Sequence, residues 1–158
     1  MSNPYKENRG IEFRLRSNDT YSLVSVPRRI EGAIAVPHTY KGKAVTKIED
    51  YAFLECKKMT SLTIPLSVCE VGFCTFAECV SLEKVEFQGY IEIVGKSAFY
   101  DCKNLKEVDF ANGVGKIAKD AFEMCEGIGC LRLEDEEYNF PERCVFDDLL
   151  EDKYFERN

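Results

Sequence analysis

Four short blocks decide the fold of this chain: A-F-L-E-C at 52–56, T-F-A-E-C at 75–79, A-F-Y-D-C at 98–102 and A-F-E-M-C at 121–125. The blocks recur at one constant spacing, so the phenylalanines (Phe53, Phe76, Phe99, Phe122) and the cysteines three places behind them form two columns with one period. A fixed period of this length is typical of a solenoid, in which each repeat is one turn of chain. One turn cannot bury its own apolar side, so the next turn must cover it.

Five further columns of apolar residues keep the same period. They begin at Val45, Ile48, Met59, Leu62 and Ile64, and each recurs three times at intervals of 23. The last three columns read apolar-x-x-apolar-x-apolar, a pattern that predicts one parallel strand in every repeat. We therefore predict a solenoid of four 23-residue repeats over residues 44–136.

The same blocks resemble a known family. They are similar to the A-F-x-x-C signature of BspA-like leucine-rich repeats, with Thr75 in place of the small alanine. The stretch A-I-A-V-P-H-T-Y-K-G-K-A-V-T-K-I (33–48) resembles the segment that leads into such repeats. The resemblance covers roughly residues 33–133. It implies a bacterial protein whose curved, right-handed α/β leucine-rich-repeat solenoid is used for protein contacts, often on microbial surfaces, and it implies no catalysis.

The beginning of the chain is predicted to cap the solenoid. Residues 1–43 hold this N-terminal cap and the lead-in segment of a single domain that covers residues 1–158. The stretches 11–16 and 20–26 alternate apolar and polar residues, which predicts a β-hairpin with its turn at 17–19. Such a hairpin would cover the edge of the first repeat, where a bare strand invites aggregation.

The end of the chain is predicted to form a second cap over residues 137–158. The period fails there, because position 145 is Val and position 148 is Asp. Pro141 is followed by acidic residues and by an apolar stripe at helical spacing, which favours a helix over 141–155. We expect the apolar stripe to pack on the last repeat; the alternative is that it binds a partner.

Charge and hydropathy exclude several classes of function. The chain has a net charge of −7, and no basic cluster lies in the repeats, which argues against nucleic-acid binding. No apolar run approaches the ~18 residues of a membrane span. Residues 1–10 contain no apolar stretch of the kind found in a secretory signal, which favours a cytoplasmic protein. The family resemblance implies the alternative, a secreted or cell-surface protein.

The four cysteines of the column are predicted to be free, while the sequence leaves the redox state of the other four open. Those of the column, Cys56, Cys79, Cys102 and Cys125, would be reduced core residues, because parallel side chains on adjacent rungs rarely reach disulfide geometry. The other four are Cys69, Cys74, Cys130 and Cys144, and we expect Cys130 to point outward. With no C-x-x-C pair and with His38 as the one histidine, the sequence predicts no metal site, no cofactor and no catalytic set.

Function is therefore expected on the outward side chains of the predicted concave sheet. Adding 23 repeatedly gives two outward columns that contain the candidate partner-binding residues Lys84, Glu86, Glu107, Asp109 and Arg132. Glu86 beside Asp109 places like charges on adjacent strands, which costs a few tenths to about 1 kcal/mol. One interpretation is a screened, solvated surface; the other is an acidic centre that accepts Lys or Arg from a partner protein. A surface adhesin that binds a host or matrix protein is the alternative function.

Self-association is a separate hypothesis, because charge is uneven along the chain. Residues 1–43 carry a net charge of +4 and residues 134–158 a net charge of −7. Head-to-tail attraction between copies would be weakened by salt, while simple solvated caps would leave the protein monomeric. Sedimentation velocity at low and high salt checks this hypothesis, and a monomer under both conditions would exclude it.

Overall fold

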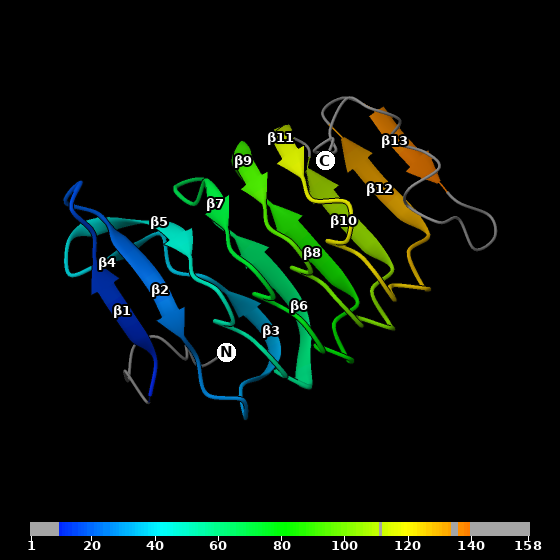
Figure 1. The fold of residues 1–158 in the computed structure, drawn as a ribbon, viewed down its shortest axis with the longest axis horizontal. Helices are drawn as coiled ribbons and strands as arrows, with labels where there is room; N and C mark the ends of the chain where they lie inside the picture. Colours follow the sequence, from blue (N-terminus) through cyan, green and yellow to red (C-terminus); the bar gives the residue numbers. More distant parts are fainter. Residues whose placement is uncertain (1–9, 111, 134–135, 140–158) are drawn as a thin grey trace.

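Two β-sheets face one another along the whole of the described chain (Figure 1). The computed structural model describes residues 10–110, 112–133 and 136–139. In spatial order, sheet A consists of β1 (Glu12–Leu15), β2 (Tyr21–Ser25), β5 (Lys43–Ile48), β7 (Glu70–Val71), β9 (Ile91–Val94) and β11 (Val114–Ile117). Sheet B consists of β3 (Glu31–Ala35), β6 (Lys58–Ile64), β8 (Lys84–Phe87), β10 (Glu107–Phe110), β12 (Cys130–Leu133) and β13 (Glu136–Asn139). The short β4 (Thr39–Tyr40) pairs antiparallel with β5.

Sheet B contains the strands that the sequence predicts. From β3 to β12 its strands are parallel. Leu62 lies opposite Val85, Val85 opposite Val108 and Val108 opposite Leu131, so from β6 to β12 the register advances by one sequence period at each step. Columns in the sequence have become rows across the sheet, and the inward rows are buried.

Sheet A is the part of the architecture that the sequence analysis did not foresee. Its strands β5, β7, β9 and β11 carry the columns that begin at Val45 and Ile48. In β11 the buried positions are Val114 and Ile117, with two more exposed residues between them. A half-buried strand is identified by buried residues at a period of two, and these buried residues lie three apart. The two columns therefore predict buried apolar residues but do not predict a strand.

The described solenoid is all-β, which corrects the α/β class predicted from the sequence. Residues 10–110, 112–133 and 136–139 contain no helix. The described chain therefore has no helix long and apolar enough to cross a membrane. The A-F-x-x-C blocks form tight turns between the two sheets. Positive φ angles recur there at the same column, at Glu55, Glu78, Asp101 and Met124. A left-handed residue in every turn is incompatible with a continued right-handed helix. The helix predicted over 141–155 lies outside the described residues.

The phenylalanine column forms the centre of the core between the sheets. Phe53, Phe76 and Phe99 are fully buried, and Phe122 is 6% exposed. Their ring centroids are 5.2, 4.9 and 5.0 Å apart in succession. Burying one such side chain contributes about 1.5–3 kcal/mol. The prediction of a buried aromatic ladder is confirmed.

A third set of hydrogen bonds links the turns. The N–H groups of Phe53, Phe76 and Phe99 donate to carbonyl oxygens of the following repeat, at 2.8, 2.7 and 2.7 Å. The substitution of Thr75 for alanine in this region is accommodated, because its hydroxyl is buried and donates to the carbonyl of Glu49 at 3.2 Å. Each repeat is therefore fastened to the next in both sheets and in the turn.

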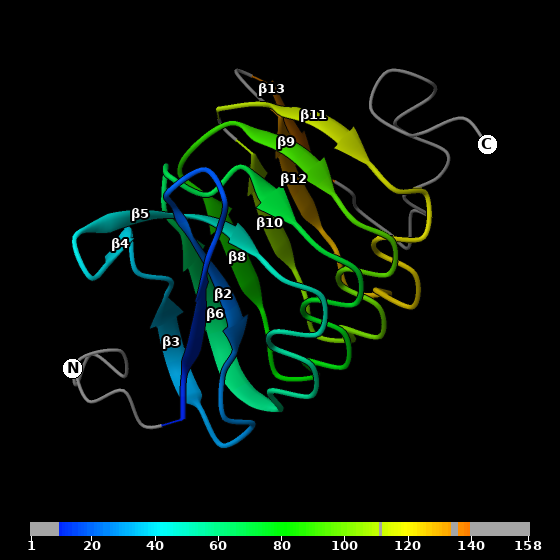
Figure 2. The ribbon, with the colours of Figure 1, turned by 60° about the vertical axis from the view of Figure 1, so that its left-hand side comes forward.

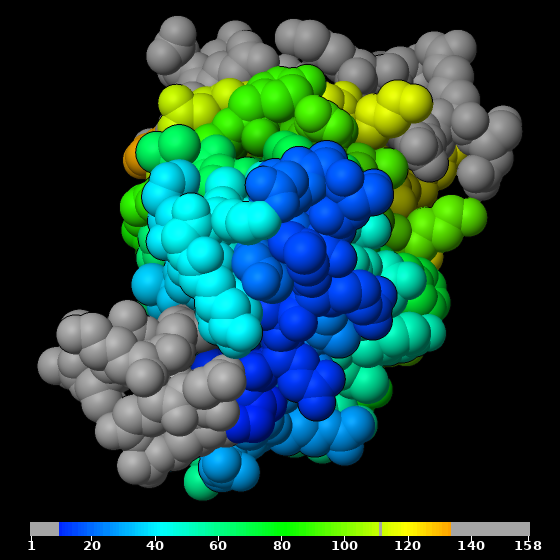
Figure 3. Space-filling view, turned by 90° about the vertical axis from the view of Figure 1, so that its left-hand side faces the viewer, coloured from blue at the N-terminus to red at the C-terminus, as the bar shows by residue number. Residues whose placement is uncertain are grey.

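The N-terminal hairpin is confirmed. Strands β1 and β2 pair antiparallel, and Asp19 in the connecting turn has φ of 65°. Strand β2 then pairs parallel with β5, so the hairpin covers the edge of sheet A. Figures 2 and 3 show it lying across the N-terminal end of the molecule.

Sheet B ends differently from sheet A. At the C-terminal side β13 pairs antiparallel with β12. At the N-terminal side the last strand of the described sheet is β3, whose register shifts between Gly32 and Ala33. Pro27 and Pro37 flank this strand. An irregular register and nearby prolines discourage another chain from pairing with an edge strand.

The stacked ring of Phe99 predicts a large loss of stability on truncation. Phe99→Ala should lower the free energy of unfolding by about 3–5 kcal/mol, because it leaves a cavity between two rings. Urea denaturation followed by circular dichroism measures the change. Phe73→Ala is the matched control, since Phe73 is 40% exposed and should cost about 1 kcal/mol or less. Equal losses for the two variants would contradict the buried ladder.

Candidate functional site

The outer face of sheet B carries the predicted partner-binding residues in two rows. We define this face by the rows Ser61, Lys84, Glu107, Cys130 and Thr63, Glu86, Asp109, Arg132. The strands bring each residue beside its counterpart in the next repeat. All five predicted residues therefore lie together on β8, β10 and β12.

Complementary charges in these rows form ion pairs across neighbouring strands. Lys84 Nζ lies 2.9 Å from Glu107 Oε1. The hydrogen bond to Glu107 raises the pKa of Lys84 above its ordinary value. Arg132 Nη1 donates to Asp109 Oδ2, also at 2.9 Å. Both groups of the first pair are substantially exposed, so we expect this pair to add little to stability.

Asp109 is less accessible than the sequence suggests. It is 7% exposed, because the side chain of Arg132 lies against it. Asp109 is also directly beside Glu86 on β8, as predicted. The repulsion expected between these two carboxylates is already reduced by the Arg132 cation. The length of the arginine side chain, which strand alternation does not describe, accounts for the difference.

Glu86 is the carboxylate of this face that the protein itself leaves available. Its side chain is partly exposed, between Thr63 on β6 and Asp109 on β10. Among the ion pairs of the described residues, none involves Glu86. The formal charges of the five predicted residues sum to −1. We therefore expect the acidic character of this face to be concentrated at Glu86, and the partner-binding role of the five residues stays a prediction.

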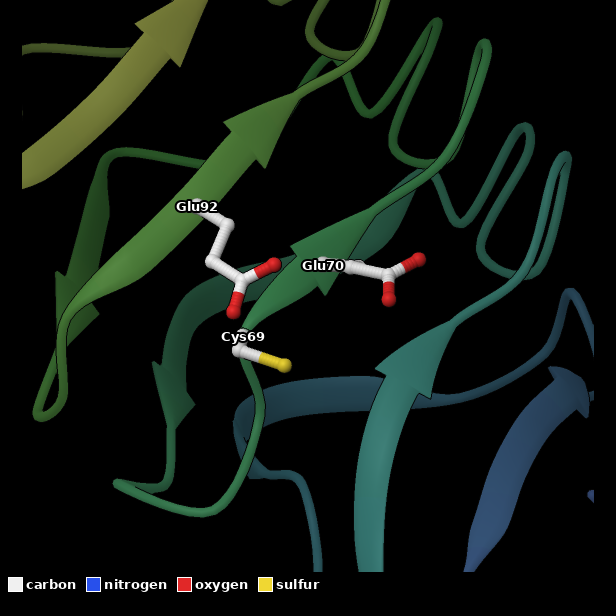
Figure 4. A group of neighbouring side chains, drawn as sticks. All are labelled: Cys69, Glu70 and Glu92. Atoms are coloured by element: carbon white, nitrogen blue, oxygen red, sulfur yellow. The ribbon is translucent and has the colours of Figure 1, made fainter. Parts of the chain in front are cut away.

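Three side chains that the sequence analysis did not group converge on the outer face of sheet A. Cys69 precedes β7, Glu70 lies on β7 and Glu92 lies on β9 (Figure 4). One potential ligand atom from each lies within 4.8 Å of the others. Cys69 and Glu92 are exactly one period apart, and this column relation is visible in the sequence. This spacing brings the two side chains together only because sheet A places them side by side, and the sequence analysis did not predict sheet A.

The contacts of this group favour an ion-pair network over a metal site. Glu70 lies 3.4 Å from Arg16 and 3.8 Å from Lys47. The Cys69 thiol donates to the carbonyl of Thr46 at 3.5 Å. Burial, followed by the nearby carboxylates, raises the pKa of Cys69, whereas a metal ligand must be a thiolate. Arg16 also donates to Thr46 at 2.8 Å, so the network ties the N-terminal hairpin to sheet A.

None of the seven cysteines of the described residues forms a disulfide, as predicted for the four of the column. Cys130 is half-buried and Cys144 lies outside the described chain. The thiols of Cys79, Cys102 and Cys125 each donate to the phenylalanine carbonyl one repeat earlier, as Cys79 does to Phe53 at 3.2 Å. Burial raises the pKa of Cys56 from 9.0 to about 12 and raises that of Cys79 further. These thiols behave as small core residues.

Comparisons with known proteins agree with this geometry. The model of the BspA type leucine rich repeat region matches residues 38–149, in six copies. A leucine-rich repeat protein from Bacteroides capillosus has a crystal structure with a TM-score of 0.69 and 25% identity, covering 85% of this chain and 96% of that one. The leucine rich repeat protein of T. pallidum gives a TM-score of 0.59 and 21% identity over 78% of this chain and 68% of that one.

A third similar structure is described as a cell surface protein. This leucine rich protein from Faecalibacterium prausnitzii gives a TM-score of 0.54 and 23% identity, covering 78% of this chain but 38% of that one. At this identity the likeness concerns the fold. No curated protein matches the sequence.

The buried thiols predict a loss of stability at alkaline pH. Folding raises their pKa values, so unfolding releases protons once pH exceeds the unfolded value of 9.0. Their contribution is complete below pH 9 and falls as pH rises toward the folded pKa, by about 1.4 kcal/mol per pH unit for each thiol. Urea midpoints at pH 8 and pH 10 measure this. Cys79→Ala should show a smaller drop between the two pH values than the wild type; an equal drop would assign the effect to other groups.

Proposed function

Because the chain belongs to the BspA type leucine rich repeat family, we propose that it is a non-enzymatic protein-interaction module that binds its partner through the outer face of sheet B. Leucine-rich repeat proteins are generally scaffolds, and nothing in the described residues indicates catalysis. We take the outer face of sheet B to be the concave face of the solenoid, and residues 1–158 to form one domain.

The observation that carries the proposal is the ordered arrangement of polar side chains on this face. Parallel pairing fixes Lys84, Glu86, Glu107, Asp109 and Arg132 on three adjacent strands, with the backbone of each held on both sides. A rigid surface of this kind loses little conformational freedom when it binds. Its two internal ion pairs preorganise Glu107 and Asp109, while Glu86 keeps its charge available.

The chemistry of the face favours a partner that presents a Lys or Arg side chain. Such a cation would pair with Glu86 and would also lie near Asp109, which is adjacent on β10. Charge complementarity of this type sets association rate and specificity more than it sets total affinity. Thr63, opposite Glu86, and Ser61, opposite Lys84, have small side chains, which would leave room for a partner's backbone to approach β6.

A surface adhesin is the second candidate. It is favoured by the likeness to the Faecalibacterium prausnitzii protein, which is described as a cell surface protein. In that case the same face would bind a host or matrix protein, and the chain would be secreted or cell-surface rather than cytoplasmic. Fractionation of the source cells with an antibody against this chain separates the two locations.

Glu86→Lys tests the proposed face. With wild-type protein as bait, a partner is first captured from an extract of the source organism and identified, and its affinity is then measured by calorimetry. Reversal of Glu86 should weaken binding at least about tenfold, which corresponds to about 1.4 kcal/mol. Reversing Asp109 as well would also break its pair with Arg132, so the single variant is sharper.

The matched control is Glu92→Lys, which reverses an exposed carboxylate on the outer face of sheet A. Both variants must retain the wild-type circular dichroism spectrum. Equal affinity of the wild type and Glu86→Lys would place the binding surface elsewhere, and a specific loss in Glu92→Lys would assign it to sheet A.

A further inference from the structure

Two aromatic side chains are exposed and in contact with each other on the turns that join the two sheets. These turns stack along one border of the molecule, at the right of Figure 2. Tyr51 lies in the first turn and is 51% exposed, and Phe73 lies in the second and is 40% exposed. Their ring centroids are 5.3 Å apart, and the ring planes are at 90° to each other. Single exposed apolar side chains need no explanation, whereas two in contact form one continuous apolar surface.

The backbone of the turns holds this aromatic pair in place. Tyr51 N–H donates to the carbonyl of Phe73 at 3.0 Å, which is one of the hydrogen bonds that join successive turns. Tyr51 has a positive φ of 61°, and so do its counterparts Cys74 and Ser97 in the next two turns, at 48° and 52°. Bulky residues rarely adopt this conformation, and its recurrence shows that the shape of the turn imposes it. The two rings are therefore presented by a preorganised backbone.

One carboxylate lies beside the aromatic pair. Asp50 directly precedes Tyr51, and its Oδ1 accepts the N–H of Phe73 at 2.8 Å. Gly72 permits this approach, because a side chain there would collide with the same oxygen. Asp50 is exposed, and none of the ion pairs among the described residues includes it. A negative charge is thus fixed next to the two rings and is not neutralised by a neighbouring cation of the described chain.

The cations of the described residues also leave both rings uncovered. Their cation–π contact is made by Lys41, which lies over the ring of Tyr40, and neither Tyr51 nor Phe73 takes part in one. Lys96 follows Phe73 in its column, but it belongs to the third turn, on the side of Phe73 away from Tyr51. The site is therefore open to a cation from outside the protein.

We propose that Asp50, Tyr51 and Phe73 bind a quaternary ammonium group such as that of choline. Two rings at a right angle form a corner in which one cation can contact both π-systems. Asp50 adds a full negative charge beside this corner. Aromatic side chains that surround a methylated ammonium ion are the usual way in which proteins recognise such ligands.

The same geometry disfavours the side chains of lysine and arginine as occupants. A primary ammonium is strongly hydrated and carries hydrogen-bond donors that ring faces cannot satisfy as water does. A guanidinium pairs best with both oxygens of a carboxylate, and one oxygen of Asp50 already accepts the N–H of Phe73. A quaternary ammonium has no donor to satisfy. Its methyl groups can pack on the rings while its charge stays close to Asp50.

Titration of the full-length protein with choline chloride, followed by NMR, tests the proposal. The ring protons of Tyr51 and Phe73 and the choline methyl signal should shift saturably with one dissociation constant, which we expect in the millimolar range. Tyr51→Ala and Phe73→Ala should each weaken binding about three- to tenfold, because each removes one cation–π contact. Tyr51→Phe keeps the ring and should bind as the wild type does. Asp50→Asn keeps the acceptor for Phe73 N–H but removes the charge, so it should also weaken binding.

Matched ligands and variants provide the controls. The neutral alcohol 3,3-dimethylbutan-1-ol has the shape of choline, and guanidinium and methylammonium represent the other cations, so all three should bind more weakly than choline. Phosphocholine, the head group of a phospholipid, should also bind more weakly, because Asp50 repels its phosphate. Tyr90→Ala removes an exposed ring that lies outside the aromatic pairs of the described residues, and it should leave choline affinity unchanged. Glu86→Lys should do the same, because the site is separate from the outer face of sheet B.

The proposal is overturned if choline produces no saturable shift at Tyr51 and Phe73. It is equally overturned if the neutral alcohol, guanidinium or methylammonium binds as tightly as choline, or if phosphocholine binds more tightly. A loss in Tyr90→Ala as large as that in Tyr51→Ala would also overturn it, since choline would then bind exposed rings without regard to the site. All variants must retain the wild-type circular dichroism spectrum.

Discussion

Hydrogen bonding between successive turns of identical length is the constraint on which the rest of this structure depends. Each repeat is joined to the next in sheet B, in sheet A and in the turn between them. An insertion or deletion in one repeat would put at least one of these three ladders out of register. The phenylalanine stack follows from this constraint, because like residues must then lie above one another, with ring centroids 4.9 and 5.0 Å apart on either side of Phe99.

The same constraint orders the surface. Strand register also fixes which outward side chains are neighbours, because the pairing that aligns Val85 with Val108 also aligns Glu86 with Asp109. The protein accommodates this forced contact by placing Arg132 on the next rung, 2.9 Å from Asp109. After this internal pairing, Glu86 is the carboxylate of the face that stays outside the ion pairs of the described residues. A repeat protein acquires a specific surface through the departures from its own repetition.

Periodicity predicts the elements that depend on it and fails for those that depend on side-chain length or on a second sheet. The strands of sheet B, the burial of the phenylalanines and the hairpin of β1 and β2 all follow from spacing and alternation. Sheet A was missed because its buried residues lie three apart. The sequence places Asp109 with Arg132 in one column and Cys69 with Glu92 in another. Column membership gives neither the burial of Asp109, which depends on the length of the arginine side chain, nor the approach of Cys69 to Glu92, which depends on sheet A.

Identical columns do not give identical chemistry, because position along the stack changes what each residue can reach. Cys79, between two rungs, is sealed by its neighbours, and its raised pKa makes it inert. Cys125 lies in the equivalent turn and donates to the equivalent phenylalanine carbonyl, that of Phe99, yet it is partly exposed. Reactivity in such a fold is therefore expected near the ends of a buried column, while recognition is expected in the middle of an exposed one.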